Sequence, residues 1–235
     1  MQTYRFVYIG ETNDPLNVNE ERQGSDVATE TAKKKTTSRR RNRPSPRQRL
    51  LTSATHLFAT EGIRVIGIDR ILREADVAKA SLYSLFGSKD NLVVAYIEQL
   101  DDQARQQWAE RTADLQDPQE KILAFFDQVV EEEPEKNYRG SYFLNAANEY
   151  PKPETESEQR IVDACLAHRR WMHSTMTELL NEKNSYPSAT QANQLLIFLD
   201  GGQAGARLVQ DPAPLYTARD LARQMLNEPP ADFSI

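Results

Sequence analysis

Residues 46–91 constrain the fold of this chain more than any other stretch, because they hold three short amphipathic helix patterns separated by tight turns. The first pattern has clear ends: Ser45 can cap it, Pro46 loses no hydrogen bond at the first helical position, and Gly62 can end it. Its apolar residues recur at helical spacing and predict one buried stripe: Leu50, Ala54, Leu57 and Phe58.

A second, shorter helix comes next and turns sharply into a third. The second begins near Ile68, and Asp76 then stands where such a turn needs a left-handed backbone, which aspartate tolerates better than most residues other than glycine. The third helix is expected from about Ala78 to Phe86, with Leu82 and Phe86 buried. Two helices joined in this way place the second one in the major groove of DNA. The residues left to face the groove are Lys79, Ala80, Ser81, Tyr83 and Ser84.

A fourth helix is expected to start at Lys89, with Ser88 as its N-cap. A positive charge at the first helical position opposes the helix dipole. A bound phosphate would explain the placement, because the helix N–H groups and Lys89 would both attract the same anion. We therefore expect a phosphate contact there.

One stretch reads GIRVIGIDRILREADVAKASLYSLFGSKDNLVVA and resembles the DNA-binding domain of TetR-family (tetracycline-repressor-like) transcriptional regulators. A later stretch, RGSYFLNAANEYP followed by HRRW, is similar to the regulatory domain of a subset of that family. The resemblance covers roughly residues 46–228. The chain departs from the family pattern at two positions: Ile66 and Gly67 stand where the family usually has a threonine, and Asp76 replaces its turn glycine.

The resemblance implies an all-α fold of about nine helices, with an N-terminal three-helix helix-turn-helix domain and a C-terminal helical bundle for ligand binding and dimerisation. It also implies a homodimer, a recognition helix from Ala78 to Ser84, phosphate contacts from Tyr83 and Lys89, and a ligand pocket in the C-terminal helices. The expected partners are therefore a double-stranded DNA operator, an unknown small-molecule effector and a second copy of the chain.

Charge divides the chain into three parts. Residues 1–32 carry 2 basic and 6 acidic side chains, residues 33–91 carry 14 and 5, and residues 92–235 carry 13 and 24, which gives net charges of −4, +9 and −11. A basic segment on an acidic body is typical of a protein with one end facing phosphate. We expect three parts: a disordered basic leader (1–45), a helix-turn-helix domain (46–91) and a helical ligand-binding and dimerisation domain (92–235).

The leader could track the DNA backbone or insert into the minor groove, or it could be only a solubilising tail. Its arginines with an expected DNA contact are Arg39, Arg40, Arg41 and Arg43. The first 26 residues differ in composition from the residues after them, so the native protein could begin later.

Composition argues against export and membrane insertion. No apolar run approaches 18 residues, and the first ten residues are too short for a signal peptide core. The one cysteine, Cys165, excludes an internal disulfide framework and agrees with a reducing compartment. A cytoplasmic protein without a cofactor is expected.

The C-terminal part offers aromatic and amide side chains that suit a pocket wall, although ordinary helix contacts produce the same pattern. A helix from about Glu158 to Glu182 places Cys165, His168 and Met172 on one face, where they could bind copper(I) or zinc or simply face a core. We favour no metal. The candidate pocket residues are Trp108, Phe125, Phe126, Tyr142, Phe143, Asn145, Asn148, His168, Trp171, Met172 and Phe198.

Two other features of this part have simple interpretations. The acidic run from Glu131 to Glu135 is interpreted as a solvated helix end and not as a catalytic carboxylate cluster.

A later helix ends in GGQAGA, and glycine inside a helix costs about 1 kcal/mol against alanine, so close helix approach should compensate. Under the resemblance, this helix and the last one form a four-helix dimer interface, although close packing within one subunit is the alternative. The candidate interface residues are Leu195, Leu199, Gly202, Ala206, Leu221 and Met225.

The sequence therefore predicts a DNA-binding transcriptional regulator and no enzyme: a homodimeric repressor that binds a palindromic operator and is released by a small molecule. Two alternatives stay open. One is a helical enzyme that modifies small molecules, although only His56, His168 and His173 could serve as neutral-pH acid-base groups. The other is a regulator that senses oxidation through Cys165. Neither the ligand, the operator, the regulated genes nor the choice between repression and activation follows from the sequence.

Overall fold

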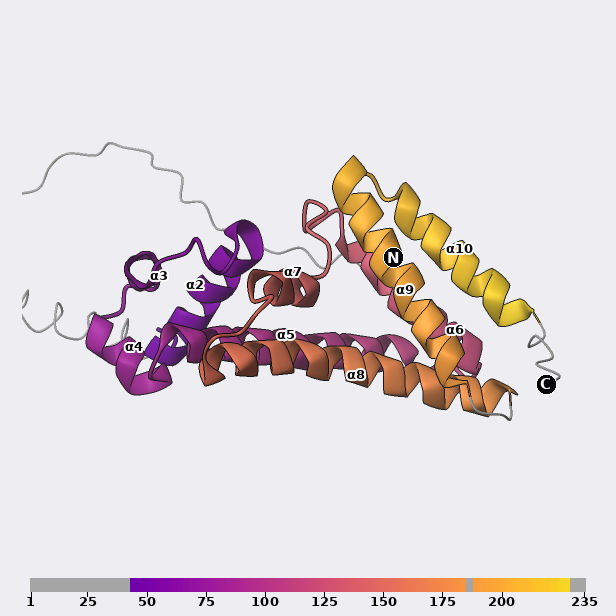
Figure 1. Ribbon diagram of the computed structural model, residues 1–235, viewed down its shortest axis with the longest axis horizontal. Coiled ribbons are helices and arrows are strands. Elements are labelled where there is room, and N and C mark those ends of the chain that lie inside the picture. The colour runs from indigo at the N-terminus through magenta and orange to yellow at the C-terminus, as the bar shows by residue number, and fades with distance from the viewer. Residues whose placement is uncertain (1–42, 185–187, 229–235) are drawn as a thin grey trace, which may run out of the picture. The chain divides into compact units, whose positions relative to one another are not determined.

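The computed structural model describes residues 43–184 and 188–228, which form nine helices and no strand (Figure 1). The predicted all-α class is confirmed for these residues. The chain divides into residues 1–43 and one compact unit of residues 44–235. The predicted leader lies outside the described residues up to residue 42. The helices are α2 (Pro46–Glu61), α3 (Ile68–Ala75), α4 (Lys79–Phe86), α5 (Lys89–Thr112), α6 (Pro118–Glu132), α7 (Tyr142–Glu149), α8 (Glu156–Asn184), α9 (Ala189–Val209) and α10 (Ala213–Asn227).

Helix starts follow the local sequence. The Ser45 hydroxyl accepts a hydrogen bond from the Gln48 N–H at 3.2 Å, and the Asp117 carboxylate accepts one from the Gln119 N–H at 2.9 Å. Both helices also have proline in their first turn. Ser88 caps α5 in the same way, through the Asn91 N–H at 3.1 Å. The predicted starts at Ser45 and Ser88 are confirmed, and α6 begins by the same rule, because each start depends on residues a few positions apart.

The turn between α3 and α4 has the backbone that was predicted for it. Asp76 adopts φ 50° and ψ 56°, the left-handed conformation. Arg49 of α2 donates a hydrogen bond to the Asp76 carbonyl oxygen at 2.9 Å, and its guanidinium lies 3.6 Å from the Asp76 carboxylate. The arginine therefore holds the turn against α2 and partly offsets the negative charge of Asp76.

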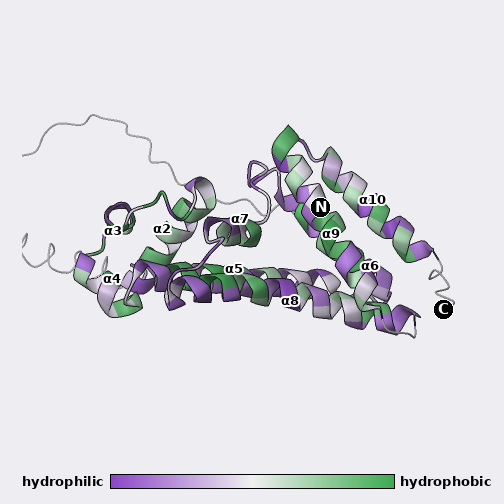
Figure 2. Cartoon of the chain, in the orientation of Figure 1, coloured by the Kyte–Doolittle hydropathy of each residue, from purple (hydrophilic) through white to green (hydrophobic). Residues whose placement is uncertain are grey.

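The buried apolar residues form two clusters. The first joins α2, α3 and α4 to the N-terminal half of α5 and continues into α7 and the start of α8 through Ala146, Tyr150 and Ile161. The second joins α6, the C-terminal half of α8, α9 and α10. Figure 2 shows the change along α5, whose N-terminal half is mainly hydrophobic and whose C-terminal half is mainly hydrophilic. The first cluster therefore crosses the predicted domain boundary at residue 92.

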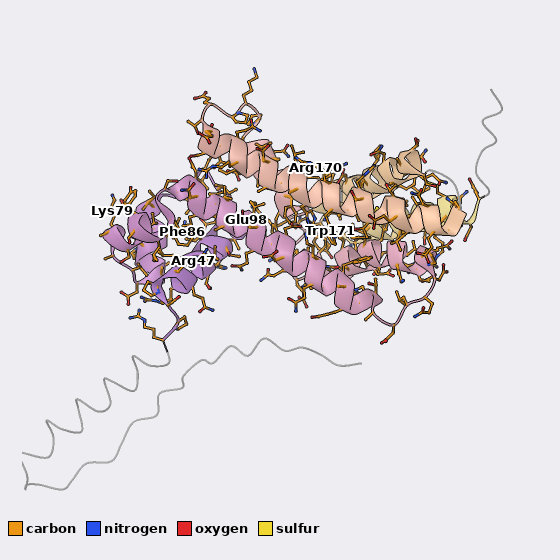
Figure 3. The ribbon with its side chains drawn as sticks, turned by 90° about the horizontal axis from the view of Figure 1, so that it is seen from below. Arg47, Lys79, Phe86, Glu98, Arg170 and Trp171 are labelled. Atoms are coloured by element: carbon orange, nitrogen blue, oxygen red, sulfur yellow. The ribbon has the colours of Figure 1, made fainter. Side chains whose placement is uncertain are left out.

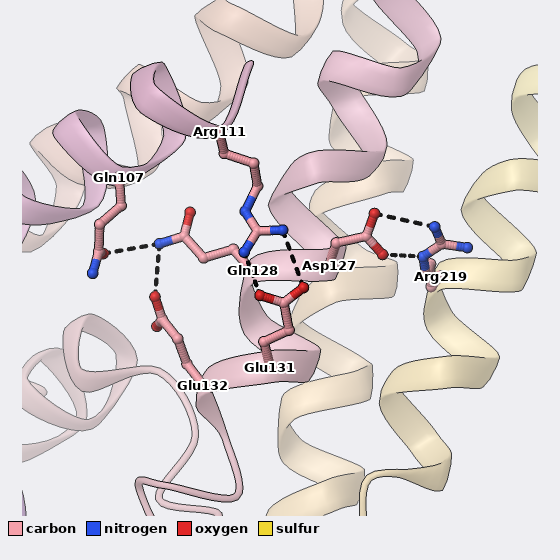
Figure 4. Close-up of polar contacts among 7 residues, drawn as sticks. All are labelled: Gln107, Arg111, Asp127, Gln128, Glu131, Glu132 and Arg219. Carbon is pink, nitrogen blue, oxygen red and sulfur yellow. Dashed lines mark hydrogen bonds and ion pairs between the residues drawn. The ribbon is translucent and has the colours of Figure 1, made fainter. Parts of the chain in front are cut away.

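Polar side chains tie α6 to the helices on both sides (Figure 4). Glu131 pairs with Arg111 of α5 at 3.1 Å, and Asp127 pairs with Arg219 of α10. The interpretation of residues 131–135 as a solvated helix end is wrong for Glu133, which has no exposed surface and accepts a hydrogen bond from the Gly140 N–H at 3.0 Å. The Glu133 side chain thus holds the loop before α7.

The four α9 residues that were predicted at a dimer interface pack inside their own subunit. Leu195, Leu199, Gly202 and Ala206 are all buried, because this side of α9 faces α8, α10 and the cavity described below. Met225 of α10 is partly buried against the second cluster. The interface assignment is therefore corrected for the four α9 residues, and close packing within one subunit explains Gly202. Leu221 stays 44% exposed.

We predict that Gly202→Ala destabilises the subunit. A Cβ atom at Gly202 would lie 2.7 Å from the Ala218 Cβ and 3.3 Å from both the Leu215 side chain and the Pro214 carbonyl oxygen. Overpacking of this kind costs roughly 1 to 3 kcal/mol, which exceeds the helix-propensity gain of about 1 kcal/mol. Chemical denaturation would measure the loss. The double variant Gly202→Ala with Ala218→Gly moves one methyl group between the helices and should recover part of it; an additive loss would contradict the close contact.

Candidate nucleic-acid interface and effector cavity

The predicted recognition helix presents the expected face. Lys79, Ala80, Tyr83 and Ser84 are exposed, Ser81 is half-buried, and the helix packs inward through Leu82 and Phe86. Lys79 lies 3.8 Å from the Asp69 carboxylate, but both side chains are more than half exposed, so this pair is weak and leaves the ammonium available. The polar face of α4 can therefore meet the edges of bases.

Arg47 of α2 extends this face and was not predicted. Its guanidinium lies 5.2 Å from the centre of the Phe86 ring, which places a cation at the C-terminal end of α4 (Figure 3). The sequence signal was available, because α2 begins with the basic residues Arg47 and Arg49 directly after the basic leader. Arg43 is exposed just before α2. Arg39, Arg40 and Arg41 lie outside the described residues.

The structure gives Lys89 an internal partner. Its ammonium donates a hydrogen bond to the Ile63 carbonyl oxygen at 2.6 Å and lies 5.9 Å from the Phe58 ring. Desolvation of this half-buried group lowers the pKa of Lys89. The ammonium keeps two further N–H donors, so a contact with phosphate stays a prediction. The sequence did not indicate the bond, since the two residues are 26 positions apart.

A cavity of about 140 Å³ lies in the body of the protein and is lined by residues of α5 to α9 and of the loop before α7. Of the predicted pocket residues, six line it: Phe125, Tyr142, Phe143, His168, Trp171 and Met172. Polar and charged residues that were not predicted also line it: Gln128, Glu132, Lys136, Ser141, Arg169, Asp200 and Gln203.

The other predicted pocket residues lie elsewhere. Trp108 stacks on Phe125 outside the cavity lining, with ring centres 5.0 Å apart, and donates its indole N–H to the Lys121 carbonyl oxygen at 3.2 Å. Phe126 is buried in the second cluster, and Phe198 packs against it. Asn145 binds the Arg139 carbonyl oxygen and Arg207, and Asn148 is exposed. Helical spacing could not separate the cavity side from these neighbouring faces.

His168 is the most distinctive polar group of the cavity. Its Nδ1 lies 2.8 Å from an Asp101 oxygen, and the other Asp101 oxygen accepts a hydrogen bond from Arg105 at 2.9 Å. Burial lowers the pKa of His168 despite the carboxylate, so the ring is neutral at pH 7. A neutral ring that bonds a carboxylate through Nδ1 must carry its proton on Nδ1. The sequence gave no signal for Asp101, which is 67 positions away.

Cys165 also lines the cavity, and burial raises the pKa of its thiol to about 12. The thiol therefore stays protonated near neutral pH, which disfavours oxidation sensing, because the thiolate is the reactive form. In residues 43–184 and 188–228, no group of three or more His, Cys, Asp and Glu side chains is arranged to hold a metal ion.

Side chains of α7, α8 and the loop before α7 hold the end of α2 and the connection between α2 and α3. Glu149, the last residue of α7, accepts hydrogen bonds from the backbone N–H groups of Ile63 at 2.8 Å and Arg64 at 2.6 Å. The Arg64 side chain pairs with Glu158 of α8 at 3.1 Å. Arg139 donates to the Ala59 carbonyl oxygen at 3.1 Å. One short helix, α7, thus contacts both the cavity and the segment that leads into the helix-turn-helix.

Comparisons with known proteins agree with this architecture. The family model of bacterial regulatory proteins, tetR family, matches residues 50–96. The crystal structure of SCO4454, a TetR-family transcriptional regulator from Streptomyces coelicolor, is 33% identical to this chain. The match covers 79% of this chain and 96% of that one, with a TM-score of 0.69. The chain belongs to the TetR family.

Other known proteins match this chain over different lengths. The HTH-type transcriptional regulator LmrA of Bacillus subtilis (strain 168) is 32% identical over 84 residues, which are 35% of this chain and 45% of that relative. This chain therefore spans less than half of that curated relative. A TetR transcriptional regulator from Legionella pneumophila has the same fold, with 22% identity, coverage of 78% of this chain and 98% of that one, and a TM-score of 0.67.

The two departures from the usual TetR-family pattern are visible in the structure. Gly67 is the N-cap residue of α3 and supplies no side-chain cap, so the threonine hydroxyl usual at this point has no replacement there. Asp76 takes the place of the turn glycine with the left-handed backbone described above. No helix among the described residues of this TetR-family protein is long and apolar enough to cross a membrane.

Proposed function

We propose that this TetR-family transcriptional regulator is a homodimeric repressor that binds a palindromic operator and releases it when a small molecule enters the cavity. One observation carries the proposal: α7 contributes cavity wall at Tyr142 and Phe143 and holds the backbone that leads into the helix-turn-helix through Glu149. A ligand that displaces α7 would therefore act on the DNA-binding helices.

Some residues would position the protein on the DNA backbone, and others would recognise the base sequence. Tyr83 is 46% exposed and would bind phosphate through its hydroxyl, whereas the smaller polar side chains of α4 would reach bases. The basic residues before α2, with Arg43 among them, would add phosphate contacts, and so would Arg47 of α2, which lies against Phe86 of α4. The residues proposed to specify sequence are Lys79, Ala80, Ser81 and Ser84.

The proposed dimer forms through an exposed apolar stripe on α9, which consists of Ile197, Gly201, Ala204 and Leu208. Ile197 is 62% exposed and Leu208 85% exposed, and the two small residues lie between them at helical spacing. Such a patch is unusual on a monomer and suits close approach of a second helix. Tyr216 and Leu221 of α10 are also exposed and would extend the contact. Two copies related by a two-fold axis would present two recognition helices to successive major grooves.

We predict that a residue that contacts phosphate and a residue that contacts bases affect DNA binding in different ways. Tyr83→Phe removes only a hydroxyl and should weaken binding to all DNA sequences alike, by roughly 10- to 100-fold for each subunit of the dimer, since a hydrogen bond to a charged group contributes about 1.5 to 3 kcal/mol. Lys79→Ala should change which bases are preferred, by about 1 to 3 kcal/mol at one position. Binding of each variant to the operator and to its single-base variants, measured by fluorescence anisotropy, checks both.

A truncation tests the leader in the same experiment. Removal of residues 1–42 should lower the slope of log affinity against log salt, because each lost phosphate contact reduces it by about 0.9. An unchanged slope would mean that the leader makes no phosphate contacts and is only a solubilising tail. A Tyr83→Phe variant with altered sequence preference would contradict the division of roles. Both point variants change exposed side chains, so an unchanged thermal midpoint serves as the folding control.

A further inference from the structure

His168 gives the cavity lining a hydrogen-bond acceptor that has no partner among the described residues. His168 is 7% exposed and lines the cavity, and its Nδ1 is already bonded to Asp101. Because Nδ1 carries the proton, Nε2 has a lone pair. Within the described part of the chain, no hydrogen bond reaches this Nε2 atom. A molecule that fills the cavity must donate a hydrogen bond to Nε2 or leave a buried polar atom unpaired, which is costly.

The surroundings of His168 are flat and aromatic. The ring of Phe143 lies parallel to the imidazole at 3.6 Å, and Trp171 lies 5.4 Å away, between α5 and α8 (Figure 3). Phe125 meets Trp171 edge to face at 5.6 Å. The cavity volume of about 140 Å³ is close to that of the roughly 150 Å³ cavity known to hold benzene. Shape and size therefore suit one aromatic ring.

The charged side chains around the cavity already have opposite partners. Arg169 pairs with Asp200 at 2.7 Å, and Lys136 pairs with Glu132 at 2.5 Å. Glu132 also accepts a hydrogen bond from Gln128 at 2.9 Å (Figure 4). An ionised ligand would have to separate one of these pairs or stay uncompensated in a mainly apolar space, so the cavity favours an uncharged molecule.

We propose that the effector is an uncharged, flat aromatic molecule whose ring fills the space beside Phe143 and Trp171 and whose hydroxyl group donates a hydrogen bond to Nε2 of His168. The inference deepens the proposed ligand-released function and rests on it. It assigns Asp101 a positioning role, because its carboxylate fixes the proton on Nδ1.

Four one-ring probes test the inference by isothermal titration with the full-length protein at pH 7: phenol, toluene, benzonitrile and benzoate. Phenol is neutral at this pH, since phenolic groups titrate near a pKa of about 10. We expect phenol to bind about tenfold more tightly than toluene or benzonitrile, the effect of one added hydrogen bond, and benzoate to bind least. Quenching of Trp108 and Trp171, the 2 tryptophans of the chain, gives a second readout.

Two variants separate the hydrogen bond from packing. His168→Phe keeps a ring against Phe143 and leaves Asp101 paired with Arg105, so toluene should bind as before while phenol loses its advantage. In Asp101→Asn, Arg105 should hold the amide oxygen, so the amide N–H would donate to Nδ1 and move the ring proton to Nε2. That ring then donates, and benzonitrile, which only accepts, should gain relative to phenol.

Equal binding of phenol and toluene, a phenol advantage that persists in His168→Phe, or no binding by any probe would overturn the inference. Operator release is measured separately by anisotropy of labelled DNA. If phenol binds with the expected profile and the operator stays bound, the ligand class stands and the proposed release mechanism fails. The two claims therefore fail through different results.

Discussion

Ala204→Arg is expected to convert the protein to a monomer and to weaken operator binding by roughly a hundred- to ten-thousandfold, the usual advantage of two linked sites over one. Ala204 is exposed in the middle of the α9 stripe, between Gly201 and Leu208. Arginine there would place a long charged side chain in the proposed contact between the two α9 stripes. Ala204 is exposed within one subunit, so the subunit itself should stay folded.

Analytical ultracentrifugation and operator titration together check this result. Ala109→Arg is the matched control, because Ala109 is also exposed on a helix, α5, but lies outside the α9 stripe. The control should remain dimeric and bind the operator normally. A dimeric Ala204→Arg protein would contradict the proposed interface, and a monomeric one with full operator affinity would contradict the proposed two-site binding.

Glu149→Gln is expected to remove most of the effect of the effector on DNA binding while leaving both ligands able to bind. The carboxylate accepts from two backbone N–H groups, those of Ile63 and Arg64. An amide has one acceptor oxygen and turns its NH₂ group toward the second N–H, so at least one bond breaks. Coupling between two sites typically changes affinity by about 5- to 150-fold, and we expect this factor to approach 1 in the variant.

Operator affinity measured with and without saturating phenol gives the coupling factor for each protein. The control is Glu98→Gln, which makes the same charge change at an exposed position of α5 with no hydrogen bond or ion pair among the described residues (Figure 3). By linkage, phenol affinity with and without operator must give the same factor. An unchanged factor in Glu149→Gln would mean that coupling runs through other contacts.

Features that depend on neighbouring residues were predictable from the sequence. The starts of α2 and α6 follow from a capping residue and a proline, and the left-handed Asp76 follows from the tight turn around it. The exposed face of α4 follows from the spacing of Leu82 and Phe86. For these features, helical period and turn chemistry are sufficient.

Features that depend on distant pairs were not predictable in the same way. Lys89 forms a hydrogen bond with Ile63, and His168 forms one with Asp101. Only tertiary packing brings these residues together. The GGQAGA glycines indicated close helix approach, but not whether the neighbour belongs to the same subunit. Gly202 faces Ala218 of α10, whereas Gly201 has open space beside it. The two glycines are adjacent in α9, yet they face different sides of the helix, and helical spacing did not show which side is packed.

The central claim is sequence-specific operator binding by a dimer, and selection from a random-sequence duplex library tests it most directly. The full-length protein would retain duplexes at about 150 mM salt, where nonspecific phosphate binding is weak. We predict enrichment of one palindrome whose half-sites lie about one helical turn apart. Retention of duplexes with no shared sequence would contradict the claim, because the basic segment would then bind phosphate without reading bases.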